Sequence, residues 1–312
     1  MDLRALSYFV VVAELQSFSK ASAHLRIAQP AVSRQIQKLE EELGVALLTR
    51  SKRKSDLTEA GLVLFDRSTF LLNQVEKIKT EVTELANEPT GRITIAAVPS
   101  AGQLLMPPLV ERYEHLYPKM SLNIIEAYTS IIEEGLTQGR FDLGLLYDPQ
   151  ARGFLDMVPL FDEPLYLIGP PNMGPSLPKE CDSDQLTKFP LLMASRPNSL
   201  RILLDQAAMK NDISFNIIRE VDSLAITKAL IRRGFGYSLM GFGAVHEEVS
   251  RGELLASPMT GQEFCRSLTI SRPSGSLITS AMTATIELIS NIAEELVDTG
   301  KWRGIVYRQS RL

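Results

Sequence analysis

The sequence predicts an α+β multidomain protein: an N-terminal winged helix-turn-helix head, a long linker helix, and a C-terminal α/β region of two lobes. Three observations support this prediction. Two short helical patterns joined by a tight turn span residues 17–44 and precede a basic loop. An apolar stripe with coiled-coil spacing then runs to about residue 87. Beyond it, strand-like apolar runs alternate with helical patterns, which indicates a parallel sheet covered by helices.

The head is predicted to contain three helices. Apolar residues at helical spacing from Leu3 to Ala13 indicate the first helix, and Ser17 and Ser19 are candidate caps of the second. Pro30 suits the first turn of the third helix, which ends at Gly44. This third helix carries an apolar stripe: Val32, Ile36, Leu39 and Leu43. Its opposite face is polar. Such a face is either an ordinary solvated surface or a surface that reads base edges and contacts phosphates, and the turn and the basic loop favour DNA.

A short two-stranded wing is predicted over residues 45–57, with Lys52-Arg53-Lys54 at its tip. Arg50 and Arg53 are candidates for minor-groove or phosphate contacts. The charge distribution agrees, because residues 1–54 carry nine Lys and Arg against five Asp and Glu, whereas the whole chain has a net charge of −4. A basic head on an acidic body is expected when only the head meets nucleic acid.

The linker helix is predicted to begin at Thr58-Glu59. Its apolar residues follow an alternating four–three spacing, with Ser68 in one slot: Leu64, Leu71, Val75, Ile78, Val82 and Leu85. This spacing is typical of a coiled-coil seam, so we expect two chains to pair here, although a lone helix could cover the stripe against its own chain. The predicted domains are 1–58 for the head, 59–88 for the linker helix and 91–312 for the C-terminal region. Lobe I covers about 91–163 and 268–300, and lobe II about 164–267.

The C-terminal region is predicted from its alternating texture. Strands are expected at 92–98, 121–127, 141–147, 157–168 (one or two, broken near Pro164), 189–194, 213–221, 236–240 and 267–271. Helices are expected at 104–117, 131–139, from about 199, from about 223, and at 281–297.

Several function classes are disfavoured by what the sequence lacks. It has no G-x-S-x-G, H-E-x-x-H or C-x-x-C motif, and Gly234-Phe235-Gly236 lacks the third glycine of a dinucleotide site, so we expect no catalytic residue, no metal and no cofactor. Cys181 and Cys265 are too few for a disulfide framework, and we expect both to be buried. A solute-binding protein would also have two lobes. However, we see no signal peptide and no membrane-spanning apolar run, so we expect a cytoplasmic protein.

On these residues the chain resembles the LysR-type transcriptional regulators. The head carries the specific part of the resemblance: Ser17-Phe18-Ser19, Ala21, Ala23, Gln29-Pro30-Ala31-Val32-Ser33, Leu39-Glu40, Glu42-Leu43-Gly44, Leu48, Arg50, Arg53, Leu57-Thr58 and Ala60-Gly61. The C-terminal region matches more weakly: Gly91-Arg92-Ile93, Phe141-Asp142-Leu143-Gly144 and Gly234-Phe235-Gly236-Tyr237. Two stretches depart from the family pattern, namely Lys54-Ser55 after the wing arginine and Met240-Gly241-Phe242-Gly243 where many relatives have a proline.

The resemblance implies a bacterial regulator with a periplasmic-binding-protein-like effector domain and a small-molecule effector. It also implies a dimer, and a dimer of dimers (a homotetramer), on an interrupted inverted repeat in double-stranded DNA, with RNA polymerase as a further candidate partner. The candidate DNA-binding residues are Ser19, Gln29, Pro30, Ser33, Arg34, Lys38, Arg50 and Arg53.

The effector site is predicted from general rules for α/β sheets. Ligands lie beyond the carboxyl ends of the strands, close to helix N-termini. The residues at such positions are Ser100, Ala101, Thr129, Tyr147, Arg196, Ser199 and Ser223. Hydroxyls and free N–H groups at helix starts suit a carboxylate or sulfate, and Arg196 would add charge. Each residue taken singly is equally an ordinary helix cap, and some members of the family act without an inducer.

Overall fold

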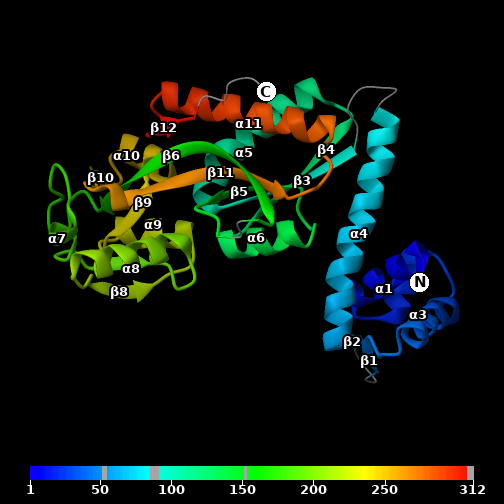
Figure 1. Cartoon of the computed structure of the whole chain (residues 1–312). Helices are drawn as coiled ribbons and strands as arrows, with labels where there is room; N and C mark the ends of the chain where they lie inside the picture. Colours follow the sequence, from blue (N-terminus) through cyan, green and yellow to red (C-terminus); the bar gives the residue numbers. More distant parts are fainter. Residues whose placement is uncertain (51–54, 85–90, 151–152, 308–312) are drawn as a thin grey trace. The chain divides into compact units, whose positions relative to one another are not determined.

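The computed structural model describes residues 1–50, 55–84, 91–150 and 153–307 (Figure 1). The chain forms two compact units, one from Met1–Glu88 with Thr137–Arg140 and the other from Pro89–Leu136 with Phe141–Leu312. Within the described residues, no helix is both long enough and apolar enough to cross a membrane.

The first unit contains the predicted head and linker helix. Its elements are α1 (Leu3–Leu15), α2 (Phe18–Leu25), α3 (Gln29–Leu43), β1 (Leu48–Arg50), β2 (Ser55–Leu57) and α4 (Glu59–Glu84). The three small helices share one apolar core, in which Phe9, Val12 and Leu39 are almost fully buried. The expected stripe of α3 holds for Val32, Ile36 and Leu39, but Leu43 at the end of the helix is 39% exposed, so the stripe is one residue shorter than expected.

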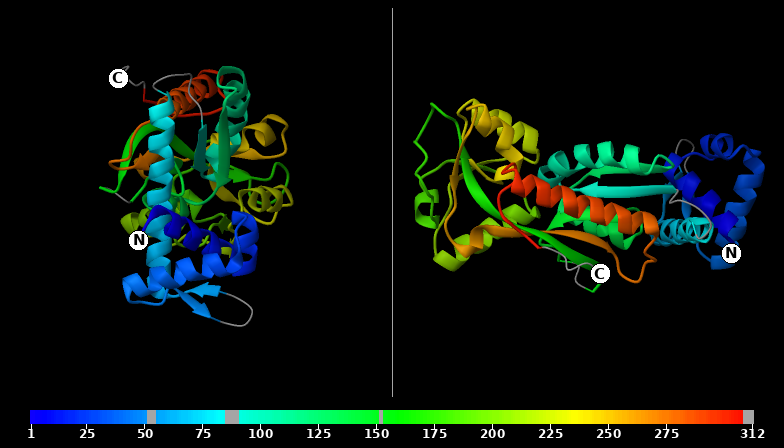
Figure 2. Two further views of the ribbon diagram at one scale, coloured as in Figure 1. Left: turned by 90° about the vertical axis from the view of Figure 1, so that its right-hand side faces the viewer. Right: turned by 90° about the horizontal axis from the view of Figure 1, so that it is seen from above.

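Lobe I of the second unit is a mixed sheet between helices. Its elements are β3 (Gly91–Ala97), α5 (Pro99–Leu116), β4 (Met120–Glu126), α6 (Thr129–Thr137), β5 (Leu143–Tyr147), the first part of β6 (Leu155–Gly169), β11 (Cys265–Pro273), α11 (Ser280–Asp298) and β12 (Ile305–Val306). The strand order is β6-β11-β5-β3-β4, with β12 beside β6. Helices α5 and α11 lie next to each other on one face of the sheet, and α6 covers the other (Figures 1 and 2).

Lobe II is built on the second part of β6, which pairs with β9 (Ser238–Gly241) and β10 (Leu255–Pro258). The remaining elements are α7 (Ser183–Leu186), β7 (Leu191–Met193), α8 (Ser199–Asn211), β8 (Ile217–Glu220), α9 (Leu224–Arg232), the 3₁₀ turns η1 (Phe242–Val245) and η2 (Gln262–Phe264), and α10 (His246–Ser250). Side chains of β6 alternate between two apolar clusters: Leu165 and Leu167 pack in the cluster that contains Leu204 of α8, and Tyr166 and Ile168 pack in that of Ile231 of α9.

Three expectations about this unit are wrong. The sheet of lobe I is mixed rather than parallel, because β11 returns antiparallel between β5 and β6. Strand β6 is continuous through Pro164, which stands where β6 exchanges its partner β11 for β9 and β10, so the missing N–H of proline interrupts the ladder least there. Helix α5 begins at Pro99 rather than at residue 104, because Pro99 fits the first helical turn. The boundaries proposed for the domains and lobes remain predictions.

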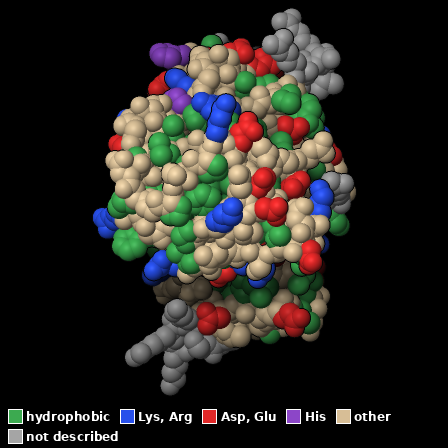
Figure 3. Space-filling view, turned by 90° about the vertical axis from the view of Figure 1, so that its left-hand side faces the viewer, with side chains coloured by type: hydrophobic (Ala, Val, Ile, Leu, Met, Phe, Trp, Pro, Cys, Tyr) green, Lys and Arg blue, Asp and Glu red, His purple; other side chains and the backbone are tan. Residues whose placement is uncertain are grey.

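The surface of lobe II is mixed in charge on the side shown in Figure 3. Lysine and arginine side chains are interspersed there with aspartate, glutamate and apolar side chains. This differs from the basic excess of the N-terminal residues and fits a chain in which the head carries the charge that suits DNA.

Candidate DNA interface and interlobe cleft

Local caps and turns set the angle between α2 and α3. Ser17 caps α2 by accepting a hydrogen bond from the Lys20 N–H at 3.3 Å, as one of the two candidate caps predicted. Arg26 ends α2 in the left-handed conformation, with φ 57°, and Pro30 lies in the first turn of α3. The chain therefore turns sharply between the two helices, as a helix-turn-helix requires.

The polar face of α3 is free to meet another molecule. Gln29, Pro30, Arg34 and Lys38 are exposed, and Ser33 is half-buried. The exposed Ser19 of α2 donates its hydroxyl proton to Gln29 Oε1 at 3.1 Å. This bond occupies the amide oxygen of Gln29 and leaves its NH₂ group as a donor at the start of the helix.

The start of the wing is hydrogen-bonded to the C-terminal part of α3. The Glu40 carboxylate accepts the backbone N–H groups of Leu47 at 2.8 Å and Leu48 at 3.2 Å. A Cβ at Gly61 would lie 2.0 Å from the Leu47 carbonyl oxygen, so only glycine allows the start of α4 to approach the wing this closely. The tip of the wing, with Arg53, and the side chain of Arg50 lie outside the described residues, so their predicted DNA contacts stay predictions.

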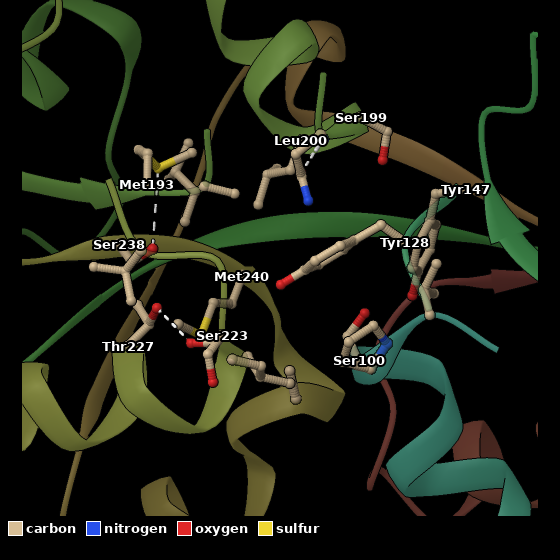
Figure 4. A pocket seen from close by; sticks show the side chains of 18 of the residues that line it. Ser100, Tyr128, Tyr147, Met193, Ser199, Leu200, Ser223, Thr227, Ser238 and Met240 are labelled. Carbon is tan, nitrogen blue, oxygen red and sulfur yellow. Dashed lines mark hydrogen bonds between the residues drawn. The ribbon is translucent and has the colours of Figure 1, made fainter. Parts of the chain in front are cut away.

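A cleft between the two lobes of the second unit forms a cavity of about 100 Å³ (Figure 4). Four helices begin at this cavity. A first-turn or capping residue of each helix lines its walls: Ser100 of α5, Thr129 of α6, Ser199 of α8 and Ser223 of α9. The N-terminal ends of helices carry partial positive charge and unpaired N–H groups. The four helix starts therefore contribute partial positive charge to the cleft.

The predicted effector residues separate into two groups in the structure. Ser100, Thr129, Tyr147, Ser199 and Ser223 line the cavity together.

Ala101 and Arg196 do not line this cavity. Ala101 is fully buried within lobe I. Arg196 is 64% exposed, and its Nε donates to Asp205 at 2.7 Å. Neither placement supports a role for Ala101 or Arg196 at the cavity.

Tyr128 and Asn198, which lie in the loops that the strand-to-helix rule indicates, also line the cavity, whereas three further polar lining residues were not predicted: Thr227, Ser238 and Arg266. Arg266 is the most consequential of them, because it is buried in the floor of the cleft on β11 and pairs with Glu163 of β6 at 2.7 Å. The two residues are 103 positions apart, so no local spacing connects them. One sequence signal could have identified Arg266: it is a charged residue directly before a predicted buried strand, and a buried charge needs a partner of opposite charge.

Tyr128 links the lobes across the cleft. Its hydroxyl donates to the backbone carbonyl of Asp222, and its ring reaches across the opening between Ser100 and Met240 (Figure 4). The Asp222 carboxylate in turn accepts the N–H and the hydroxyl of Ser195, and these bonds lower the pKa of Asp222. Burial, followed by the nearby carboxylates of Asp222 and Glu126, raises the pKa of Tyr128, so its phenol stays protonated and remains a donor.

The departure from the family pattern at Met240-Gly241 has a structural role here. Met240 lines the cavity. A Cβ at Gly241 would lie 2.0 Å from Glu163 Oε1, so glycine at this position makes room for the buried carboxylate.

The two cysteines differ from each other. Cys181 is buried as expected, but the expectation is wrong for Cys265, which is exposed at the start of β11. Burial raises the pKa of Cys181 to about 11. The pKa of Cys265 is also raised, by desolvation and by the neighbouring carboxylates of Asp162, Asp148 and Glu163.

A helix-turn-helix head and a separate two-lobed domain with a lined cleft define a DNA-binding transcriptional regulator with an effector-binding domain. The chain belongs to the LysR family: residues 3–62 match the bacterial regulatory helix-turn-helix proteins of that family, and residues 86–293 match the LysR substrate binding domain. It is a regulator and not an enzyme.

Named relatives agree with this assignment. The chain is 32% identical to the HTH-type transcriptional regulator BbuR of Bordetella bronchiseptica, over 86% of this chain and 83% of that protein. It is 30% identical to the hca operon transcriptional activator HcaR of Escherichia coli, over 84% and 88% of the two chains. Full-length OxyR of Pseudomonas aeruginosa shares the fold, with a TM-score of 0.75, 23% identity and 99% of each chain covered.

Proposed function

We propose that α3 enters the major groove of DNA. Gln29, Pro30 and Ser33 read base edges there, while Arg34, Lys38 and Ser19 bind the phosphate backbone. Arg50 and Arg53 contact the DNA from the wing. The single observation that supports this most is the Ser19–Gln29 hydrogen bond, because it orients an amide whose NH₂ group can donate to a base at the exposed start of the helix.

We further propose that α4 pairs two chains. Three of its seam residues are exposed in the single chain, with 41% of Leu71, 48% of Ile78 and 63% of Val82 accessible. A stable protein covers such a stripe, and a second copy of the same seam fits it. Paired heads would bind an interrupted inverted repeat, and two such pairs would form the dimer of dimers.

The cleft is proposed to hold a small anionic effector. Its support is the convergence of four helix N-termini and one buried arginine on one cavity. Effector binding would shift the closure of the lobes, change the shape of the tetramer and thereby the bend of the DNA, which RNA polymerase would read at the promoter. A saturating effector that leaves both the DNase footprint and the bend angle unchanged would contradict this mechanism.

The assignment of α3 residues is tested by selecting sites from random DNA with the full-length protein, Gln29→Ala and Lys38→Ala. Gln29→Ala is expected to relax the preference at one base position of each half-site, by about 1–3 kcal/mol. Lys38→Ala is expected to weaken binding uniformly and to reduce the salt dependence, because it removes a phosphate contact. An unchanged sequence preference in Gln29→Ala would remove this residue from the readout.

A further inference from the structure

A buried ion pair forms the floor of the cleft. Arg266 is 7% exposed and Glu163 only 1%. Both Nε and Nη2 of Arg266 donate to Glu163 Oε2, at 3.0 and 2.7 Å. Burying two charges costs free energy unless further hydrogen bonds satisfy them. The other hydrogen bonds of Arg266 and Glu163 therefore indicate the role of the pair.

Glu163 is held from two further directions. The Tyr147 hydroxyl donates to Oε2 at 2.7 Å, and the indole N–H of Trp302 donates to Oε1 at 2.5 Å. Burial, ahead of the opposing effect of Arg266, keeps the pKa of Tyr147 well above its ordinary value, so this phenol remains a donor. The carboxylate thus has four donors, and its charge is spread over all of them.

Trp302 comes from the C-terminal end of the described chain, which is itself fixed in place. Its ring is 1% exposed and lies 4.8 Å from the ring of Phe161, centroid to centroid. The next residue, Arg303, places its guanidinium 3.6 Å from the ring centroid of Phe242 in lobe II. Strand β12 then pairs with β6 at Phe161 and Asp162.

Arg266 retains binding capacity toward the cavity. It lines the cavity, stacks 3.6 Å above the centroid of the Tyr147 ring, and reaches Ser100 Oγ through Nη2 at 3.4 Å. Among the described residues, no acceptor is recorded for its Nη1. Thr129 Oγ1, on another wall of the same cavity, is buried and also lacks a partner there.

The opposite wall of the cavity is apolar, formed by Leu192, Met193, Leu200, Leu239 and Met240. Glu163 cancels the charge of Arg266, so the cleft offers the partial charges of four helix starts and the unused donors of a neutral pair. This is enough to stabilise one negative charge, but a second would be buried uncompensated. By comparison with a cavity of about 150 Å³ that takes the six heavy atoms of benzene, the space of about 100 Å³ suits a ligand of roughly four heavy atoms, the scale of a short carboxylate.

We propose that this cleft selects a singly charged carboxylate with a short apolar body, with Arg266 as its anchor and with Glu163 and Trp302 as the residues that position that anchor. The proposal rests on the proposed effector function and names its ligand class. It also makes the C-terminal segment part of the effector site.

The test uses calorimetry and thermal shift on the full-length protein with three probes of similar size: propionate, its neutral isostere propionamide, and the dianion oxalate. Propionate should bind saturably, and the other two at least tenfold more weakly. In Arg266→Gln combined with Glu163→Gln, which avoids leaving a lone buried charge, the preference for propionate over propionamide should fall severalfold, because only the four helix starts remain to favour the anion.

Two single variants separate positioning from simple structural support. Glu163→Gln leaves the charge of Arg266 uncancelled, so both anions should bind more tightly and oxalate should gain the most. Trp302→Phe keeps an aromatic ring but removes the N–H donor. It should weaken propionate severalfold while affinity for propionamide and for DNA stays unchanged. A merely structural role would lower the melting temperature without altering this charge selectivity.

The outcomes distinguish this proposal from the broader one. Absence of saturable propionate binding, equal binding of propionamide, or an unchanged preference in the double variant would overturn it. Ser199→Trp, which fills the cavity, provides the second comparison. If it abolishes binding of probes that show no charge preference, the cleft remains a ligand site and only the anchor fails. If it abolishes nothing, the cleft itself is not the site.

Discussion

Glu40 performs a structural task that its sequence position alone does not reveal. It lies near the end of α3, yet its carboxylate accepts two backbone N–H groups at the start of the wing. A side chain that accepts hydrogen bonds from two otherwise unpaired N–H groups contributes more to folding stability than a solvated charge does, because its removal leaves both donors unpaired.

Glu40→Ala is therefore expected to destabilise the head by about 1–3 kcal/mol. Chemical denaturation followed by circular dichroism measures this change. Glu41→Ala is the matched control, because Glu41 is exposed and, within the described part of the chain, accepts a hydrogen bond only from Gln37. Equal stability of the two variants would show that the wing does not depend on this carboxylate.

Cys265 gives a prediction that depends on pH. A raised pKa keeps the thiol protonated at neutral pH, and the thiolate is the reactive form. The alkylation rate of Cys265 should thus remain low near pH 7.5 and keep increasing above the ordinary cysteine pKa of about 8.5. Rates measured by mass spectrometry with iodoacetamide test this expectation.

The same reasoning bears on peroxide. Some relatives of the chain are named hydrogen peroxide-inducible genes activators. With both thiols of raised pKa, DNA binding by this chain should be the same before and after a brief peroxide treatment, with Cys265→Ser as the control. A rapid change in DNA affinity that Cys265→Ser abolishes would contradict it.

Helix α4 connects a sequence pattern to an assembly. Its seam follows the four–three spacing, and Leu71, Ile78 and Val82 of that seam are exposed in the single chain, although Ser68 is buried in it. Val63 is 61% exposed but lies off the seam. Leu71→Glu should weaken dimerisation by on the order of 1.5–3 kcal/mol per chain, because it removes a buried leucine from the interface. Analytical ultracentrifugation measures the dissociation constant.

Val63→Glu provides the control for charge and helix position. If it dissociates the dimer as strongly as Leu71→Glu does, the seam is misassigned. If both variants stay dimeric, α4 is not the pairing element.

The elements differ in how much the sequence could predict. Local signals were sufficient where the cause is local: Ser17 as a cap, Pro30 in the first turn and Gly44 as the residue that ends α3 all lie where the pattern indicates. The continuous β6 and the antiparallel β11 could not be predicted in the same way, because their arrangement depends on partners about a hundred residues away.

The candidate site follows the same division. The hydroxyls at helix starts were predictable from strand-to-helix order, and four of them line the cavity together with Tyr147 at the end of β5. Arg266 was not, since its significance depends on Glu163, Tyr147 and Trp302, which the fold alone brings together. Arg196 shows the converse, because a basic residue beside a predicted ligand loop bonds Asp205 instead.

The whole chain joins a helix-turn-helix head to a domain whose two lobes meet at a cleft. Within the second unit, β6 and β11 run between the lobes, and Tyr128 bonds across the opening. Closure of the cleft is therefore tied to the same strands that carry Glu163 and Arg266. Under the proposed function, an effector bound in this cleft would therefore act on both lobes at once.

The most direct test of the account is a salt-titrated binding isotherm on DNA selected from a random pool, comparing the intact protein with Arg34→Ala and Arg251→Ala. Arg251, on lobe II, is equally a surface arginine, 63% exposed and paired with Glu247. The account predicts tight binding by the intact protein, a loss of about 1–3 kcal/mol in Arg34→Ala, and no loss in Arg251→Ala. Weak binding that is indifferent to Arg34 would contradict α3 as the recognition helix of this protein.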